Sequence, residues 1–269
     1  MGSFEQICRG QHASLVEASL EFAGDEYPDL PIREYLELLY LLGRDFQRFR
    51  GKENQPENIL RLLGDYFFGE LGFTGNTEEY YDPRNSYLNE VIDRRVGIPI
   101  TLSVLYQYMA HSSGITLHGM NFPGHFLLAY QREHDRIYID VFQSGRWLDW
   151  QECETRLSEL GTGNASLTEG GLAPMSPRDI LVRMLRNLKG IYSRSDLGRC
   201  LRIQQRIARL SPHDPSEVRD LGILYFHAGR PTEAVRTLDR LKRQHPEMVD
   251  HEVIDSYLSK AARKAILVN

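Results

Sequence analysis

The sequence predicts an α+β fold, in which a helix-rich domain with a small antiparallel sheet is followed by an all-helical module. Apolar residues recur at spacings of three and four along much of the segment 14–111, a pattern typical of amphipathic helices. Short segments rich in aliphatic and aromatic residues are confined to 117–142, where strands are expected. Beyond Pro177 two stretches repeat at offsets of 33 and 34 residues, which indicates a repeat built from helix pairs.

The first part of the chain is expected to contain five helices. In the second of them, Pro31 stands near the first turn, where its missing N–H costs nothing, and apolar residues recur as far as Phe49. Pro28 helps to separate this helix from the one before it. The Gly-rich stretch 69–76 is expected to be a loop. The helices are expected at 14–22, 31–49, 58–68, 85–95 and 99–111.

Three strands are expected next, at 117–120, 126–130 and 136–142. The last two are joined by the polar residues 131–135, a link whose length suits a hairpin. A small antiparallel sheet follows from this arrangement, because strands joined by short links pair with their neighbours.

Composition and length indicate a globular protein. The chain has 269 residues, 41% of them hydrophobic and 26% charged, as in an average folded domain. No apolar run is long enough to span a membrane, and the first residues do not form a secretory signal. We therefore expect a cytoplasmic protein without a membrane association.

The cysteines exclude two kinds of site. Cys8, Cys153 and Cys200 are an odd, sparse set without C-x-x-C spacing, so neither a disulfide framework nor a zinc site is expected. Free thiols in a reducing compartment fit this pattern. The sequence also lacks a P-loop, a dinucleotide fingerprint and an H-E-x-x-H motif, so no metal and no cofactor is expected.

Charge divides the chain into two parts. The net charge is −5, yet between Arg178 and His245 there are 15 Lys and Arg residues against 7 Asp and Glu residues. An acidic body and a basic C-terminal third predict two modules. We expect a first domain at 1–160, a linker rich in Gly, Asn and Pro at 161–176, and a helical module at 177–269.

The helical module has the period of tetratricopeptide repeats. Its second copy fits that repeat better, with Gly222 and Ala234 at positions that take small residues. The first copy has Lys189 and Cys200 at the matching positions. A helix at 250–265 is expected to cap the repeats. Because two repeats are too few for an independent solenoid, we expect the module to pack on the first domain or on a third, degenerate helix pair.

The order of elements between 97 and 140 suggests a candidate site. A helix begins at Pro99, His125 opens a strand behind a Pro-Gly turn, and Asp140 lies on the next strand. Papain-like and transglutaminase-like enzymes share this order. In them the helix start lowers the pKa of a cysteine, the histidine is its base and the aspartate orients the imidazole.

The residues of this segment are more specific than the order of its elements. The sequence R-R-x-G-I-P-I-x-L-S-x-L-Y at 94–106 is followed by P-G-H-F-L at 123–127 and I-x-I-D at 137–140. It resembles a bacterial family of uncharacterised proteins that join a transglutaminase-like core to C-terminal tetratricopeptide repeats, and the resemblance covers nearly the whole chain. It implies a transglutaminase-like cleft near the motif residues Asn89, Arg94, Arg95, Gly97, Pro99, Asn121, Pro123 and Gly124.

One departure from the enzymes decides the expected function. The helix start reads Pro-Ile-Thr-Leu-Ser over 99–103 and contains no cysteine. Thr101 and Ser103 offer hydroxyls, but a hydroxyl within a helix often bonds back to a carbonyl. We therefore expect a non-catalytic adaptor that binds a protein or peptide. The alternative is a hydrolase or acyltransferase that uses His125 and Asp140 with a nucleophile other than cysteine.

The candidate residues also have structural interpretations. His125 could cap its strand, and Asp140 could bond a turn amide. The hairpin register is open: a loop symmetric about Glu133 turns Asp140 away from His125, whereas a shift of one residue brings the two together. The cluster 93–95 is either an anion site at the cleft or a set of salt bridges at a helix end.

Four arginines in the helical module form a stripe on one helix face. This stripe is either a docking surface for an acidic peptide or phosphate, or a solvated face opposite apolar residues. Nucleic acid is not the expected partner, because no nucleic-acid module accompanies the stripe and the chain as a whole is acidic. The four residues are Arg199, Arg202, Arg206 and Arg209.

Overall fold

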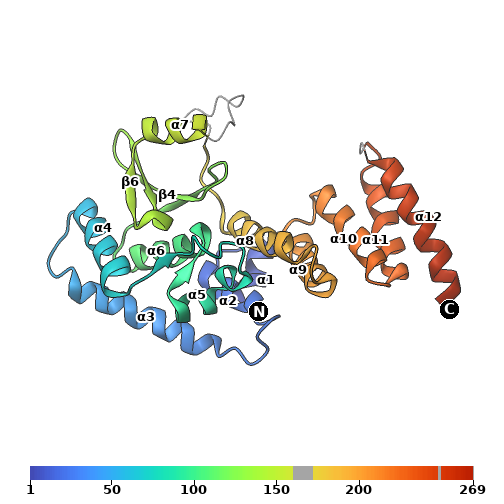
Figure 1. Ribbon diagram of the computed structural model, residues 1–269, viewed down its shortest axis with the longest axis horizontal. Helices are drawn as coiled ribbons and strands as arrows, with labels where there is room; N and C mark the ends of the chain where they lie inside the picture. The colour runs from blue at the N-terminus through green and yellow to red at the C-terminus, as the bar shows by residue number, and fades with distance from the viewer. Residues whose placement is uncertain (160–171, 248–249, 269) are drawn as a thin grey trace. The chain divides into compact units, whose positions relative to one another are not determined.

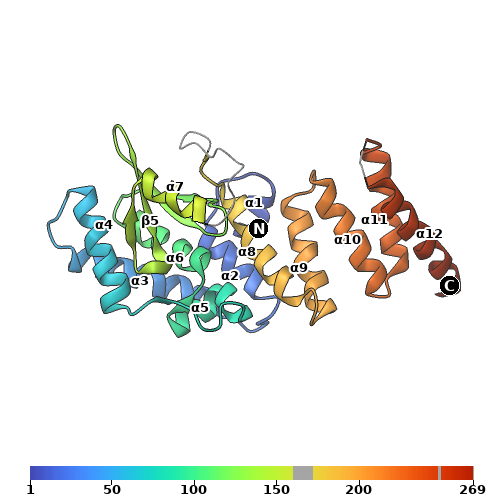
Figure 2. The same ribbon diagram turned by 45° about the horizontal axis from the view of Figure 1, so that its top comes forward.

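The computed structural model describes residues 1–159, 172–247 and 250–268. The chain divides into two compact units, Met1–Leu181 and Val182–Asn269, which can be followed by colour in Figures 1 and 2. The division falls within helix α8 (Pro177–Tyr192). Most of the linker expected at 161–176 lies outside the described residues.

The first unit is rich in helices, and the five predicted ones are present. The stretch expected as one helix at 58–68 begins as an α-helix and continues as a π-helix, η1. Helices α1 and α7 were not predicted, because neither has a long apolar period. The strand expected at 136–142 ends at Asp140, and the short helix η3 follows it. The helices of this unit are α1 (Ser3–Cys8), α2 (Leu15–Ala23), α3 (Ile32–Phe49), α4 (Pro56–Gly64), η1 (Asp65–Glu70), η2 (Pro83–Ser86), α5 (Leu88–Arg94), α6 (Pro99–Ser112), η3 (Val141–Gln143) and α7 (Trp150–Glu159).

Helix α6 forms the centre of the first unit. Every residue from Pro99 to Tyr106 is buried. A helix that is apolar on all sides is stable only when other elements surround it. Helices α3, α4 and α5 and the strand β4 pack around α6. The start of this helix, which carries the motif, is therefore part of the core.

The predicted small antiparallel sheet is confirmed. It contains β3 (His118–Met120), β4 (Leu127–Gln131), β5 (Arg136–Asp140) and β6 (Arg146–Leu148), in that order. Figure 1 shows α6 and α7 on opposite sides of this sheet. Tyr138 packs with the buried Cys153 of α7 in one apolar cluster. Because strand residues alternate, Ile139 faces the other way, and it is also fully buried.

A second, two-stranded sheet joins β1 (Thr74–Gly75) to β2 (Val96–Gly97) in parallel. The prediction of an uninterrupted loop at 69–76 was therefore wrong. A strand of two residues is too short for alternation of apolar and polar residues to be detected. Gly75 is needed here because a Cβ at this position would lie 2.6 Å from the Phe142 ring.

The second unit is all-helical in its described residues, as predicted. Asp196 and Asp214 cap α9 and α10 by accepting hydrogen bonds from backbone N–H groups. Each of the helices from α9 to α12 packs against the next in antiparallel pairs (Figure 1). They are α9 (Leu197–Leu210), α10 (Pro215–His227), α11 (Pro231–Gln244) and α12 (His251–Val268). Within the described residues of the chain, no helix is long and apolar enough to cross a membrane.

Candidate functional site

His125 lies in a turn rather than in a strand. Its backbone N–H donates to the carbonyl oxygen of Phe122 at 3.0 Å, and Gly124 has a φ of 69°. Strand β4 begins two residues later, at Leu127. The prediction that His125 opens the strand was therefore wrong, because the Pro-Gly turn extends through the histidine.

The hairpin register brings His125 and Asp140 together. Gln131 pairs with Arg136, so the connecting loop has one residue fewer than the expected 131–135. The symmetric arrangement about Glu133 is thus wrong, and the register shifted by one residue is the one observed. His125 Nε2 lies 2.9 Å from Asp140 Oδ1.

Asp140 is a buried carboxylate whose two oxygens are both engaged. Arg156 Nη1 donates to Oδ2 at 2.8 Å, and the backbone N–H of Gln143 donates to Oδ1 at 3.1 Å. Burial alone would raise the pKa of Asp140, but the hydrogen bonds from His125, Arg156 and Gln143 outweigh it and lower this pKa. The carboxylate therefore stays charged. It contacts the imidazole of His125 at Nε2, so Nδ1 is the ring nitrogen that does not face Asp140.

Arg156 is a site residue that the sequence analysis missed. It lies on α7, and its Nη2 also donates to Gln143 Oε1 at 2.8 Å. It thereby joins α7 to the segment that follows β5. An arginine in a short helix with no long apolar period carries no signal that it will reach back to Asp140.

The start of α6 carries no accessible nucleophile. Ile100 is 2% exposed, and Thr101 and Ser103 are fully buried. The Thr101 hydroxyl donates to the carbonyl oxygen of Asn85 at 2.8 Å and accepts from the N–H of Ile98 at 3.2 Å. Thr101 is therefore a capping residue. The Ser103 hydroxyl has no hydrogen-bond partner among the described residues.

None of the three cysteines stands at the helix start. Cys153 is fully buried within the sheet and α7 cluster, and burial raises the pKa of its thiol to about 12. Cys200 is buried in the second unit, where burial also raises the pKa of its thiol. Cys8 ends α1 and is partly exposed. All three are free cysteines.

Asn85 organises the neighbourhood of the helix start. It is fully buried, and its Nδ2 donates to the carbonyl oxygens of Glu79 at 2.8 Å and Tyr80 at 3.3 Å. Its Oδ1 accepts from Asn76 Nδ2 at 3.2 Å. The backbone carbonyl of Asn85 also accepts a hydrogen bond from the Thr101 hydroxyl. Asn85 thereby joins the loop 76–82 to α6.

A row of aromatic rings leads from His125 to the surface. The His125 and Phe142 rings are 6.2 Å apart edge to face. Phe142 meets Tyr80 at 6.0 Å, and Tyr80 meets Tyr81 at 5.3 Å. His125 has 20% of its side chain exposed. The imidazole therefore lies at the inner end of an aromatic surface.

The cluster 93–95 forms contacts at the end of α5. The Tyr35 hydroxyl donates to Asp93 at 2.6 Å. Arg95, with a φ of 59°, ends the helix and donates to the carbonyl oxygen of Leu71 at 2.8 Å. Arg94 lies 3.8 Å from Asp82. Of these contacts only that of Arg94 with Asp82 is an ion pair, and the choice between an anion site and helix-end salt bridges stays a prediction.

The other motif residues serve the backbone or lie near the turn. Asn89 is buried in α5, and a Cβ at Gly97 would lie 2.9 Å from Thr101 Oγ1. Pro99 occupies the first turn of α6. Asn121 is exposed and Pro123 is half-buried beside the turn that holds His125.

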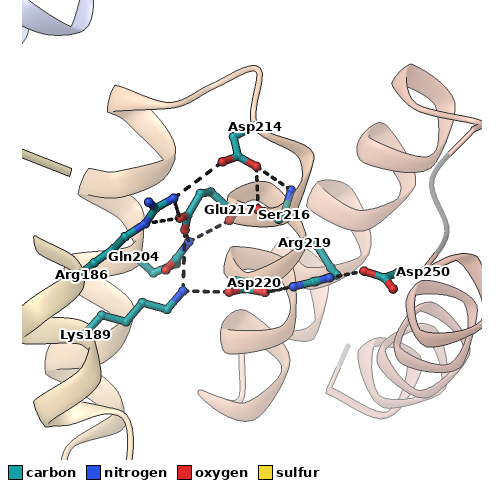
Figure 3. A network of polar contacts seen from close by, with 9 residues as sticks. All are labelled: Arg186, Lys189, Gln204, Asp214, Ser216, Glu217, Arg219, Asp220 and Asp250. Carbon is teal, nitrogen blue, oxygen red and sulfur yellow. Dashed lines mark hydrogen bonds and ion pairs between the residues drawn. The ribbon is translucent and has the colours of Figure 1, made fainter. Parts of the chain in front are cut away.

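The second unit contains a network of charged side chains, shown in Figure 3. Glu217 is 4% exposed and accepts two hydrogen bonds from Arg186, at 2.9 and 2.6 Å. Gln204 Nε2 donates to its other carboxylate oxygen at 2.8 Å. Lys189 donates to Asp220 at 2.8 Å. The lysine that departs from the repeat pattern thus has a partner on α10.

The arginine stripe of α9 is already engaged in the chain. Arg199 pairs with Asp196 at 3.0 Å and lies over the Tyr192 ring. Each of Arg202, Arg206 and Arg209 also takes part in an interaction. Docking of an acidic partner here stays a prediction. Among the described residues, His, Cys, Asp and Glu side chains form no group of three suited to hold a metal ion.

Comparison with known proteins gives two matches within the chain. The profile of a family described as the Transglutaminase-like superfamily matches residues 33–186, and that of a Tetratricopeptide repeat matches residues 188–259. A UPF0162 protein of Xylella fastidiosa is 34% identical over 261 residues, which cover 94% of this chain and 91% of that protein.

Two further proteins are similar over a smaller share of their own length. The human F-box only protein 21 is 30% identical over 183 residues, which cover 64% of this chain and 28% of that protein. A crystal structure of menin, which reveals its binding site for the Mixed Lineage Leukemia protein, matches with a TM-score of 0.55 and 13% identity. The match covers 98% of this chain and 66% of the menin chain, and it concerns the fold alone.

Proposed function

We propose that this chain, which belongs to the transglutaminase-like superfamily and carries C-terminal tetratricopeptide repeats, is a non-catalytic adaptor that binds protein partners. The observation that carries the proposal is the start of α6. Where a transglutaminase-like enzyme needs a thiol, this helix has Pro99, the buried Ile100 and the capping Thr101. In this sense the protein is a pseudoenzyme.

The repeats and the thiols support the same proposal. Helical repeats commonly bind extended or helical peptides on their concave face. Cys153, the cysteine nearest to Asp140 in the chain, is fully buried with a pKa of about 12, so it is not a thiolate at neutral pH. Three free cysteines fit a reducing compartment, and we place the adaptor in the cytoplasm on that ground. Menin, which shares the fold, has a binding site for another protein.

An assay of the intact chain tests the proposal. The wild-type protein is incubated with glutamine-containing protein, amine donors and a panel of peptides and esters. We expect no amine incorporation and no hydrolysis above that of a His125→Ala variant. His134→Ala is the matched control, because His134 is 94% exposed at the hairpin tip. An activity that is lost in His125→Ala and kept in His134→Ala would show an enzyme and overturn the adaptor.

The thiols give a second test. At neutral pH we expect iodoacetamide to modify Cys8 first, because Cys153 and Cys200 are buried and burial raises the pKa of both thiols. Mass spectrometry of the native chain follows each site over time. Rapid modification of Cys153 would contradict this order and would make that thiol a candidate nucleophile.

One observation favours a second candidate function, a hydrolase or acyltransferase. The pair of His125 and Asp140 is formed, with 2.9 Å between Nε2 and Oδ1, which is the contact by which an aspartate orients a histidine base. Its nucleophile would be Ser103, whose hydroxyl has no partner in the described chain but is fully buried. If Ser103→Ala and Asp140→Asn each abolished an activity of the folded parent, this second function would replace the adaptor.

A further inference from the structure

We propose that Tyr80, Tyr81 and Phe142 form an aromatic ledge beside His125 that binds a basic segment of the protein partner. The partner's lysine or arginine side chains would lie on the two tyrosine rings. The inference rests on the adaptor function and deepens it, because it names the place of binding in the first unit and the chemistry of the partner.

The first observation is exposure. Tyr80 is 40% and Tyr81 is 78% exposed, although both are large aromatic residues adjacent in sequence. Exposed aromatic side chains are frequent anchors of protein interfaces, since each buries a large area when a partner covers it. Phe142 connects this pair of rings to His125 without a break. The ledge and the imidazole therefore belong to one continuous surface.

The second observation is that the ledge is held in place. Asn85 is fully buried and binds the carbonyl oxygens of both Glu79 and Tyr80. The backbone N–H of Glu79 also donates to Asn76 Oδ1 at 2.8 Å. A loop fixed in this way loses little conformational entropy when a partner binds, which strengthens binding by exposed rings.

The third observation is charge. Glu78 and Glu79 are exposed and precede the two tyrosines directly. Neither takes part in an ion pair among the described residues, whereas Asp82 is paired with Arg84 at 2.7 Å. Two carboxylates beside two aromatic faces attract a cation and repel an anion, because the face of an aromatic ring is itself negative. A basic peptide is the occupant that fits both features.

A selection of random displayed peptides on the full-length protein tests the inference. A parallel selection uses the double variant Tyr80→Ala with Tyr81→Ala, and Tyr40→Ala is the matched control, since Tyr40 is 58% exposed on α3. We expect peptides rich in lysine and arginine from the wild type and the control. Measured by fluorescence anisotropy, they should bind the double variant at least about tenfold more weakly.

Charge and a milder variant complete the test. The variant Glu78→Gln with Glu79→Gln should weaken binding by about threefold to fivefold at low salt and less at high salt. Tyr81→Ala alone, at an exposed position that tolerates truncation, should give part of the loss. Acidic or uncharged peptides from the wild type, no enrichment at all, or equal binding by the double variant would each overturn the inference.

The outcome is distinguishable from failure of the adaptor. Each selected peptide is incubated with the protein and analysed by mass spectrometry. A basic peptide that binds the ledge and is cleaved or modified would leave the ledge standing and overturn the non-catalytic function. Selected peptides that remain intact but ignore the ledge would overturn the ledge and leave an adaptor that acts through its repeats.

Discussion

The two helix pairs of the repeat region, α8 with α9 and α10 with α11, repeat the same helical unit but differ in the side chains at matching positions. In the second pair, α10 and α11 approach closely, because a Cβ at Gly222 would lie 2.5 Å from a methyl carbon of Leu238. The matching positions of the first pair hold Lys189 and Gln204. Gln204 is fully buried and donates to Glu217 at 2.8 Å. Residues of the first pair, α8 and α9, therefore bind the buried carboxylate of Glu217 on α10, whereas the second pair has a close apolar contact at the matching positions.

A departure from a repeat pattern need not weaken the fold. A buried charge is tolerated only when it is paired and hydrogen-bonded. Arg186 and Gln204 bond the Glu217 carboxylate, and Lys189 Nζ lies 3.7 Å from it. Lys189, which departs from the repeat pattern, thus lies among the residues that satisfy this group. The departure replaces one stabilising arrangement with another.

The largest expected effect comes from placing the glutamine of the first pair in the second. Leu238→Gln should lower the free energy of unfolding by about 3 kcal/mol, since it removes a buried apolar side chain and buries an amide with no carboxylate to receive it. Far-UV circular dichroism during urea unfolding measures this, because both tryptophans, Trp147 and Trp150, lie in the other unit. Hydrogen exchange along α11 localises the loss.

The reverse exchange should cost less. Gln204→Leu removes two hydrogen bonds to Glu217, one to its side chain and one to its carbonyl oxygen, both of 2.8 Å. The added apolar burial offsets part of that loss, so we expect about 1–2 kcal/mol. If the two exchanges destabilised equally, the chemical difference between the helix pairs would be without consequence.

Alanine at the two equivalent positions, 189 and 222, separates the steric contribution from the electrostatic one. Gly222→Ala should cost about 2 kcal/mol, because the new methyl group overlaps Leu238. Lys189→Ala removes an ion pair with Asp220 and meets no steric limit, so a loss of about 0.5–1 kcal/mol is expected. Equal unfolding midpoints for the two variants would show that the close approach of α10 and α11 can relax.

The smallest effect concerns pH and belongs to the charged network. Burial would raise the pKa of Asp220, but the bonds from Lys189 and Arg219 outweigh it and lower this pKa. A carboxylate with a lowered pKa stabilises the fold above its unfolded value of about 4 and loses this contribution as the pH falls below it. Stability of the parent should thus decline more steeply below about pH 4 than that of Asp220→Asn. If stability fell equally with pH in the parent and in Asp220→Asn, Asp220 would not contribute to the acid dependence.

The sequence predicted the helices and the main sheet because these elements have periodic patterns. It missed β1, β2 and β6, whose two or three residues are too short for alternation to be detected. The repeat was found from its offsets, with Lys189 as one departure from its pattern. The roles of Lys189 and Gln204 were not predicted, because their partner Glu217 lies on another helix and a single sequence does not show which side chains meet.

The candidate site was predicted in part for the same reason. His125 and Asp140 were found from their order along the chain, and their contact depended on a register that hydrophobic pattern left open. Arg156 and Asn85 act through contacts between distant segments, with Asp140 in one case and with the loop 76–82 in the other. Neither has a local signature. A hydrophobic pattern indicates which residues are buried and which element they form, but it does not indicate which polar side chains contact each other.

Asn85 holds the loop through its side-chain amide and α6 through its backbone carbonyl, and the amide restricts which substitutions position 85 can accept. Aspartate is one nucleotide change away from asparagine and has nearly the same shape. At this position, however, a carboxylate oxygen would replace the amide group that faces the carbonyl oxygens of Glu79 and Tyr80. A lineage that accepts this change inherits a loosened loop, even though every residue on its surface is unaltered. A single buried amide thus makes one of the commonest mutational steps costly to take.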